Sequence, residues 1–199
     1  ADNDSTNPIE NSGTIQLTGD KSIGKYKIGA GIINNTGIGI IEVGESANPD
    51  DPSIGIYSDN VGDTINNTGT VTSGKKSIGI YSAGGTVIQN GVSDIGNTGV
   101  GIYSTNGTVN VGGTSVFNFG TDNAVGVYAI NSAVTNNATM NIGSGNYGFV
   151  LTNGTFTGGT GSVTMGSDSV YVYRSGLGTI TNGSTVTMSG SDNIGFYIV

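Results

Sequence analysis

Short apolar runs alternate with polar turns along the whole chain, and one of these runs returns almost unchanged. It reads Ser-Ile-Gly-Ile-Tyr-Ser at 53–58 and 77–82, with close variants at 99–104 and 124–129. Weaker copies begin at 22, 146, 169 and 193. From Gly55 onward its third position recurs at steps of 24, 22, 25, 22, 23 and 24 residues. A repeat of this period is typical of solenoids, in which each repeat forms one coil of a stack.

Each repeat contains three apolar runs. In the segment 59–82 they centre on Ile65, Val71 and Ile78–Tyr81, and Asn, Thr, Gly and Ser residues separate them. β-Branched and aromatic residues predict short strands, and the residues between them predict turns. No segment carries apolar residues at helical spacing for long enough to predict a helix. We therefore expect an all-β parallel β-helix, a solenoid of about eight coils of 22–25 residues with three short strands per coil.

The repeat also predicts the domain organisation. Residues 9–199 are expected to form a single β-helical domain, because the period runs through all of them. Residues 1–8 precede the first apolar run, and we expect them to form a flexible N-terminal segment. The second coil is longer than the others, since residues 45–52 interrupt its period as a loop insertion.

Strand alternation assigns the side chains of the recurring run to two faces. The residues on either side of the glycine, such as Ile54 and Ile56 or Ile78 and Ile80, share one face. The glycine and the tyrosine share the other. Burying the aliphatic pairs keeps many large apolar groups out of solvent, so we expect them in the core and the tyrosines outside.

The outward tyrosines predict an aromatic stripe. Its members are Tyr57, Tyr81, Tyr103, Tyr128 and Tyr173, with Tyr26 and Tyr197 beyond them and Val150 as a gap. Such a stripe can cover the bare backbone of neighbouring glycines and so stabilise the sheet. It can also grip a sugar ring or an apolar patch of a protein. The two interpretations are compatible.

Two polar columns accompany the strands. The asparagines near the first turn are expected to form hydrogen bonds from coil to coil, and they are Asn11, Asn35, Asn67, Asn90, Asn137 and Asn182. The aspartates before the third strand are expected to form turns, and they are Asp20, Asp122, Asp168 and Asp192. The calcium-binding Gly-Gly-x-Gly-x-Asp pattern is missing, so we expect no metal and no cofactor.

The insertion is a better candidate for a binding site than the tyrosine stripe. Loops that leave a regular solenoid carry individual side chains, whereas the coils repeat one pattern. Its candidate residues are Glu45, Asn48, Asp50 and Asp51. The other interpretation is a solvated loop stiffened by Pro49 and Pro52.

Composition narrows the functional classes. The chain has no Cys and no His, which excludes disulfides, thiol nucleophiles and a histidine base. A net charge of −8 without a basic stripe argues against binding to nucleic acid. With Arg174 as the sole arginine, we expect no enzymatic activity. The alternative is a carbohydrate-active β-helix enzyme, a polysaccharide lyase or hydrolase, which needs acidic side chains from neighbouring coils in one groove.

The order of Asn-Asn-Thr-Gly-Thr-Val, Thr-Asn-Gly-Thr and Ser-Ile-Gly-Ile-Tyr-Ser resembles the passenger repeats of type V autotransporter adhesins. Within that family, the repeats resemble those of the large fusobacterial outer-membrane autotransporters. The resemblance implies a right-handed β-helix displayed at the cell surface or secreted, with adhesion to a host or bacterial surface protein or glycan and a role in virulence. Membrane contact would come only through a translocating barrel that lies outside this chain.

The chain stops at Phe196-Tyr197-Ile198-Val199, inside a predicted strand. Solenoid ends without a polar cap leave backbone groups and apolar side chains unpaired. We therefore expect that the native protein continues past Val199, and that the isolated chain associates end to end.

Overall fold

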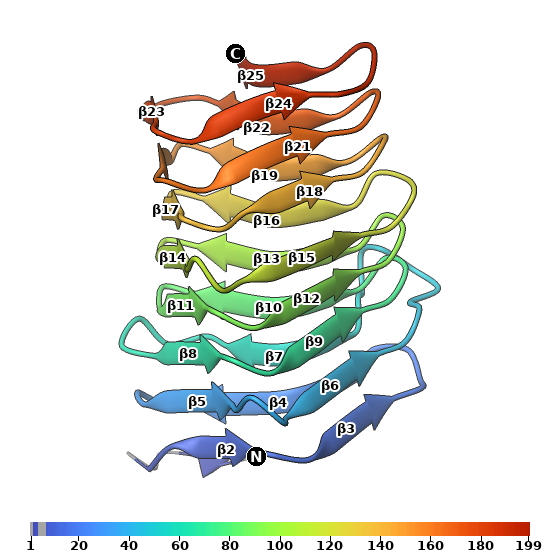
Figure 1. Cartoon of the computed structure of the whole chain (residues 1–199). Helices are drawn as coiled ribbons and strands as arrows, with labels where there is room; N and C mark the ends of the chain where they lie inside the picture. The colour runs from blue at the N-terminus through green and yellow to red at the C-terminus, as the bar shows by residue number, and fades with distance from the viewer. Residues whose placement is uncertain (1, 4–6) are drawn as a thin grey trace.

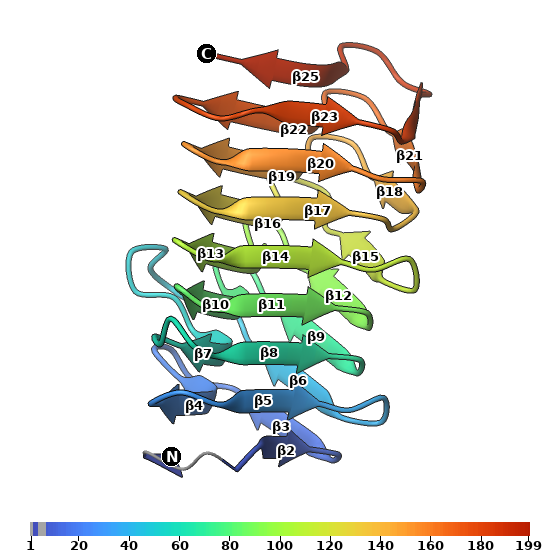
Figure 2. The same cartoon turned by 90° about the vertical axis from the view of Figure 1, so that its left-hand side faces the viewer.

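A computed structural model of the chain describes residues 2–3 and 7–199. The chain winds into a stack of coils, and all its strand pairs are parallel (Figure 1). As the chain rises, β5 and β6 run towards the right at the front and β7 returns at the back, so the winding is right-handed (Figures 1 and 2). The predicted all-β parallel β-helix of about eight coils is confirmed. The described residues include no helix, and hence none that is long and apolar enough to span a membrane.

Each coil contributes one strand to each of three faces (Figure 2). Sheet A, built from the recurring run, joins β1 (Asp2–Asn3), β4 (Ile23–Ile28), β7 (Ile54–Ser58), β10 (Ile78–Ala83), β13 (Val100–Thr105), β16 (Val125–Ile130), β19 (Tyr147–Thr152), β22 (Val170–Ser175) and β25 (Ile194–Ile198). Sheet B joins β2 (Ile9–Asn11), β5 (Ile32–Asn35), β8 (Thr64–Asn67), β11 (Thr86–Gln89), β14 (Thr108–Val111), β17 (Ala133–Asn136), β20 (Thr155–Gly158) and β23 (Ile180–Asn182).

The third face consists of two sheets in succession. Sheet C joins β3 (Thr14–Leu17), β6 (Ile40–Val43), β9 (Thr70–Ser73), β12 (Val92–Ile95) and β15 (Val116–Phe119). Sheet D joins β18 (Met140–Ile142), β21 (Ser162–Met165) and β24 (Thr185–Met188). The insertion lies between β6 and β7, where the interrupted period places it.

The N-terminal segment contributes to the sheet. Asp2 and Asn3, within the 1–8 segment expected to be flexible, form β1 and pair with Lys27 and Ile28 of β4. Residues 1 and 4–6 of that segment lie outside the described residues.

The core fills the space between the three faces. In sheets B and C the side chains alternate as predicted, so that Ile65 of β8 and Val71 of β9 are buried while their neighbours Thr64 and Thr70 lie partly in solvent. Further along the stack the core becomes aromatic. Phe149, Phe156 and Tyr171 pack against one another with ring centroids 4.8–5.7 Å apart.

The predicted alternation is wrong in sheet A. In β7, Gly55 and Ile56 are both buried, whereas Ile54 and Tyr57 are both partly exposed. The same order recurs in β10, β13, β16 and β19. The register of β7 with β10 pairs Ile54 with Ile78 and Ile56 with Ile80, and it skips the glycines between them. Each strand therefore bends at its glycine and turns two consecutive residues inward. Ile54, Ile78 and their equivalents lie on the outer surface.

Close packing explains why glycine usually occupies the bend. A Cβ atom at Gly55 would lie 2.6 Å from the carbonyl oxygen of Gly79 and 3.2 Å from Cγ2 of Ile41. In β22 the equivalent residue is Tyr171, and its side chain is fully buried. The bend position thus faces the core in each of these strands, because the one large residue that occupies it points inward.

A ladder of buried amides runs along the end of the sheet B strands. It is formed by Asn11, Asn35, Asn67 and Gln89. Each asparagine Nδ2 donates to the side-chain carbonyl oxygen of the next member, at 2.8, 2.8 and 2.9 Å. The predicted hydrogen bonding from coil to coil is therefore confirmed. The predicted membership is wrong in two places, since the register puts Gln89 and Asn136 in this column and leaves Asn90 and Asn137 one residue beyond it.

Candidate binding surfaces

The predicted tyrosine stripe runs along the outer face of sheet A. The continuous part consists of Tyr57, Tyr81, Tyr103 and Tyr128, whose rings stack within 6° of parallel at centroid distances of 4.9, 5.2 and 5.2 Å. Tyr26 lies on Tyr57 at a tilt of 56°. Burial raises the pKa of Tyr57 and of Tyr103, and the nearby Asp59 carboxylate adds to the shift at Tyr57. The stripe is thus a packed array of rings.

The stripe has its predicted gap at Val150. Strand pairing places Val150 of β19 between Tyr128 of β16 and Tyr173 of β22, and Tyr173 stacks on Tyr197 beyond the gap. A hollow of about 230 Å³ lies at the gap, and it is lined by Val125, Tyr147, Val150 and Tyr173.

A second apolar column runs beside the tyrosines, because the bends turn the first residue of each strand outward. Its members are Ile23, Ile54, Ile78, Val100, Val125, Tyr147, Val170 and Ile194. We call the two columns together the aromatic–aliphatic face. The glycines point to the opposite side, so the proposed shielding of glycine backbone by the tyrosine rings is wrong. The rings are supported by one another.

The insertion folds back onto the turns of the neighbouring coils. Ser46 is buried, its N–H donates to the carbonyl oxygen of Lys75 at 2.9 Å, and its Oγ lies 2.9 Å from Oγ of Ser77. The N–H of Ser53 donates to Ser46 Oγ at 2.8 Å. The N–H of Ala47 donates to Oδ1 of Asp20 at 2.8 Å. The insertion is therefore part of the scaffold at its base.

The four candidate residues of the insertion do not form one site. Asp51 makes an ion pair with Lys21, and this contact raises the pKa of the Lys21 amine. Asn48 accepts the N–H of Asp50 through Oδ1 at 3.1 Å and so shapes the tip of the loop. Glu45 lines a separate hollow, together with Lys75 and residues of β9, β12 and β15.

The two prolines of the insertion have a role that the sequence interpretation missed. Pro49 and Pro52 line a hollow of about 240 Å³ whose other lining residues include Lys76, Ile78, Val100, Tyr103 and Tyr128. The insertion therefore borders the aromatic–aliphatic face. A pattern of prolines in a loop carries no signal for this contact, because it depends on where the loop folds.

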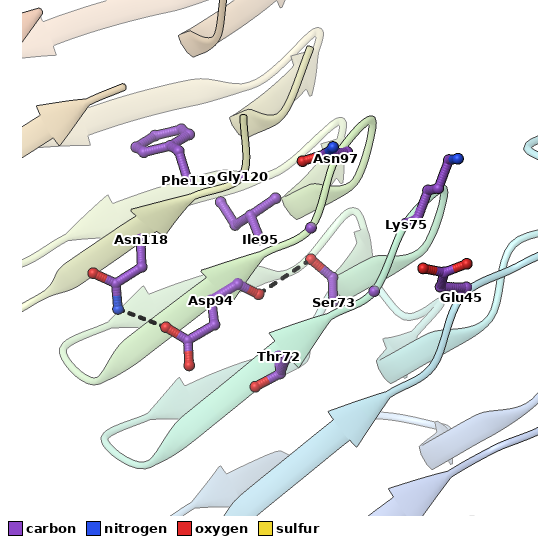
Figure 3. A pocket seen from close by; sticks show the side chains of 12 residues that line it. Glu45, Thr72, Ser73, Lys75, Asp94, Ile95, Asn97, Asn118, Phe119 and Gly120 are labelled. Carbon is purple, nitrogen blue, oxygen red and sulfur yellow. Dashed lines mark hydrogen bonds between the residues drawn. The ribbon is translucent and has the colours of Figure 1, made fainter. Parts of the chain in front are cut away.

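A hollow of about 600 Å³ lies where β9, β12 and β15 lead into their turns (Figure 3). Glu45, Lys75, Asp94 and Asn118 are among its lining residues. Asp94 accepts a hydrogen bond from Nδ2 of Asn118 on the next strand. The hollow is therefore lined by two carboxylates that are far apart in the sequence, one from the insertion and one from β12, and Figure 3 shows them well separated, with Ser73 and Lys75 between them.

In the turns that precede the sheet A strands, the residue at one recurring position has a left-handed backbone conformation. The residues there are Lys21, Lys76, Thr98, Asn123, Asp168 and Asp192, with φ between 50° and 58°. Asp168 and Asp192 thus form turns, as predicted. In the part of the chain that the structure describes, no three His, Cys, Asp or Glu residues gather closely enough to hold a metal ion.

Two buried lysines were not singled out in the sequence. Lys25 pairs with Ile56 and Lys27 with Ser58, so both side chains occupy core positions of β4. Nζ of Lys25 donates to the carbonyl oxygens of Ile9 and Asn34 at 2.9 and 3.0 Å. Burial lowers the pKa of Lys25 to about 8, against the opposing effect of Glu10. The sequence did contain a signal for the burial of Lys25, since this lysine takes the place of the second isoleucine of the recurring run.

Comparison with known proteins found no matching family model, no matching curated protein and no matching solved structure.

Proposed function

We propose that the chain is a segment of a surface-displayed bacterial adhesin, a rigid β-helical stalk that presents binding surfaces to a host or bacterial surface protein or glycan. The aromatic–aliphatic face carries this proposal. It extends as two adjacent columns from β4 to β25, and most of its members are partly or fully exposed. Contiguous apolar surface of this kind is unusual on a soluble monomer and marks sites of interaction.

The stalk architecture supports the same function. Parallel strands lie about 4.8 Å apart, so eight coils make a rod roughly 40 Å long. Each coil is joined to the next by hydrogen-bond ladders on three faces, except that β15 and β18, the adjoining ends of sheets C and D, are not paired. A rod of this kind holds a binding face at a fixed orientation, and the insertion adds a raised wall beside it.

A binding screen tests the proposal. The 199-residue chain is immobilised and exposed to a library of host-cell surface proteins and to a glycan array. We expect at least one partner whose binding is lost in Ile78→Ser and Tyr81→Ser, two changes on the aromatic–aliphatic face. Thr164→Ala, on the outer surface of sheet D, is the control that should bind normally. Partners that bind all three variants equally would contradict the proposed role of this face.

The second candidate function is that of a polysaccharide lyase or hydrolase, and the observation that favours it is the shared hollow of Glu45 and Asp94 (Figure 3). Paired carboxylates are the groups that glycoside hydrolysis uses as acid and base or nucleophile. The test is incubation with a panel of acidic and neutral polysaccharides, followed by assay of new reducing ends and unsaturated products. Turnover that disappears in both Glu45→Gln and Asp94→Asn would establish this function, and a panel left intact would reject it.

A further inference from the structure

A column of glycines lies in the hollow of about 600 Å³ where β9, β12 and β15 lead into their turns (Figure 3). Gly74, Gly96 and Gly120 are the residues that directly follow these three strands, and all three line the hollow, which we call the Gly96 hollow. A Cβ atom at Gly74 would lie 2.5 Å from the carbonyl carbon of Gly44, and one at Gly96 would lie 2.8 Å from that of Gly74. Close stacking of the coils therefore keeps side chains out of this column and leaves peptide backbone bare.

Polar side chains stand on both sides of the glycine column. Strand register pairs Thr72 with Asp94 and Asp94 with Asn118, so these side chains form one row on the outer surface of sheet C. Figure 3 shows Lys75 and Glu45 on the other side of the column. Three strands span two inter-strand spacings, so the row on sheet C is roughly 10 Å long. The hollow is thus open along several coils, in the direction of the stack.

Many polar atoms of the hollow are available to a ligand. Within the described residues, the side chains of Glu45, Thr72 and Lys75 make no hydrogen bond and no ion pair. Asp94 accepts one hydrogen bond, from Nδ2 of Asn118. The second carboxylate oxygen of Asp94 and the amide oxygen of Asn118 remain. The hollow therefore offers a hydroxyl, an ammonium, an amide and two carboxylates from neighbouring coils.

This lining favours an uncharged ligand rich in hydroxyl groups. Carboxylate, amide, hydroxyl and ammonium groups together accept and donate the hydrogen bonds that sugar hydroxyls make. The carboxylates of Glu45 and Asp94 outnumber the ammonium of Lys75, which disfavours an anion. An apolar anchor for a protein side chain is missing from the lining, since Ile95 is 3% exposed and Phe119 packs against the core. The volume lies in the range of small-ligand sites.

We propose that the Gly96 hollow binds a neutral oligosaccharide, whose hydroxyls donate hydrogen bonds to Asp94 and Asn118 and accept them from Thr72 and Lys75. The bare glycine column lets a sugar ring approach the backbone closely. Binding needs none of the bond cleavage that the second candidate function requires. The inference deepens the proposed adhesin function, because it names a glycan site apart from the aromatic–aliphatic face. Only the role of the bound sugar in adhesion rests on that function.

The test is an NMR titration of the 199-residue chain with three neutral trisaccharides, which are maltotriose, cellotriose and N,N′,N″-triacetylchitotriose. Trigalacturonic acid is the anionic probe. We expect shifts at the lining residues with at least one neutral probe, and a millimolar dissociation constant, because the hydrogen bonds gained replace hydrogen bonds to water. Trigalacturonic acid should bind at least about five-fold more weakly, since like charges repel it.

Asp94→Ala and Glu42→Ala form a matched pair of variants. Glu42 pairs with Thr72, so it stands in the same column one coil before the hollow and outside its lining. Each of the two carboxylates accepts one amide hydrogen bond from a neighbouring strand, Glu42 from Gln16 and Asp94 from Asn118. Asp94→Ala should weaken sugar binding about ten-fold, because it removes a charged acceptor. Glu42→Ala should leave the binding unchanged.

Three results would overturn the proposal: no shifts at the lining residues with any neutral trisaccharide, equal losses of binding in Asp94→Ala and Glu42→Ala, or tighter binding of trigalacturonic acid than of every neutral probe. The adhesin function has a separate readout in the screen with Ile78→Ser and Tyr81→Ser. Sugar binding in the Gly96 hollow together with a screen that finds no partner would count against the adhesin function and leave the sugar site assigned.

Discussion

Single residues matter most in this protein where a repeat position is occupied by an unusual side chain. Lys25 takes the place of a core isoleucine, and Tyr171 takes the place of a glycine at a bend. Both are buried. The first brings a charge into the core of the first coil, and the second brings a large ring into the core of a late coil. Their effects on stability can be separated by pH and by substitution.

Lys25 should make stability depend on pH in the mildly alkaline range. Its pKa is about 8 in the folded chain and 10.5 as the ordinary value, so between these values the unfolded chain binds more protons. Stability should therefore rise as pH increases through this window, and the cost of burying the charge should be fully present below pH 8. Thermal melting followed by circular dichroism between about pH 7 and 9.5 measures this rise. Lys25→Met should flatten it, whereas Lys21→Met, at an exposed lysine, should not. Equal slopes in the parent chain and Lys25→Met would contradict the assignment.

The bend in sheet A predicts unequal effects at two neighbouring isoleucines. Ile80→Asn puts an unpartnered amide into the core and should cost about 2–4 kcal/mol of unfolding free energy. Ile78→Asn changes the outer surface and should cost about 1 kcal/mol or less. Urea unfolding of both variants measures the difference. If Ile78→Asn is the more damaging change, the strand does not bend as described.

At the scale of elements, the stripe and the insertion each link several coils. The tyrosine rings form a continuous contact along sheet A, and the insertion connects its own coil to the turns before β4 and β10. Both therefore contribute to stability through contacts between coils that no single strand contains.

We expect the folded chain to become less stable at high pH, where Tyr57 and Tyr103 of the stripe ionise. Burial raises the pKa of Tyr57 and Tyr103 above the ordinary value of 10.0, so their contribution is fully present below pH 10 and is lost as pH rises through the folded-state values. Ultraviolet absorbance of tyrosinate and circular dichroism should show ionisation and loss of structure together. Tyr103→Phe removes one of these groups and should unfold at higher pH than the parent chain. An alkaline midpoint unchanged by this substitution would argue against the mechanism.

The base of the insertion should matter more for folding than its tip. Ser46→Ala removes the acceptor for the N–H of Ser53 and the partner of the Ser77 hydroxyl, and should cost about 1–2 kcal/mol. Asp50→Ala, at the exposed tip, should change stability by about 0.5 kcal/mol or less. Chemical denaturation compares the two. A smaller effect of Ser46→Ala than of Asp50→Ala would contradict this distinction between the base and the tip of the loop.

At the scale of the whole molecule, the coils stabilise one another through their shared faces. In this 199-residue chain β25 has one neighbour in sheet A, β22, and its other edge is unpaired. Phe196, Tyr197 and Ile198 are 38%, 44% and 53% exposed. Unpaired edges with apolar side chains are templates for association.

We therefore expect the isolated chain to associate end to end at high concentration. Sedimentation velocity over a range of concentrations should show dimers and longer species. Ile198→Lys together with Phe196→Lys places two charges at this edge and should shift the population to monomer. A parent chain that stays monomeric throughout would show that this edge is not adhesive.

Local pattern was sufficient to predict the period, the three strands per coil, the number of coils, the stacked tyrosines and the gap at Val150. Each of these depends on residues that repeat in register, and in a parallel stack the same register brings equivalent residues side by side. The position of the insertion followed from the same period.

The tertiary structure alone decided which side of each sheet A strand faces the core, because a glycine has no side chain to mark its direction and a single skipped residue reverses the face of its neighbours. It also decided that Gln89 and Asn136, not Asn90 and Asn137, stand in the amide column. The hollows beside Pro49, Asp94 and Val150 come from contacts between segments distant in the chain. Such contacts depend on where loops fold and how far strands bend, and the sequence of one coil does not contain that information.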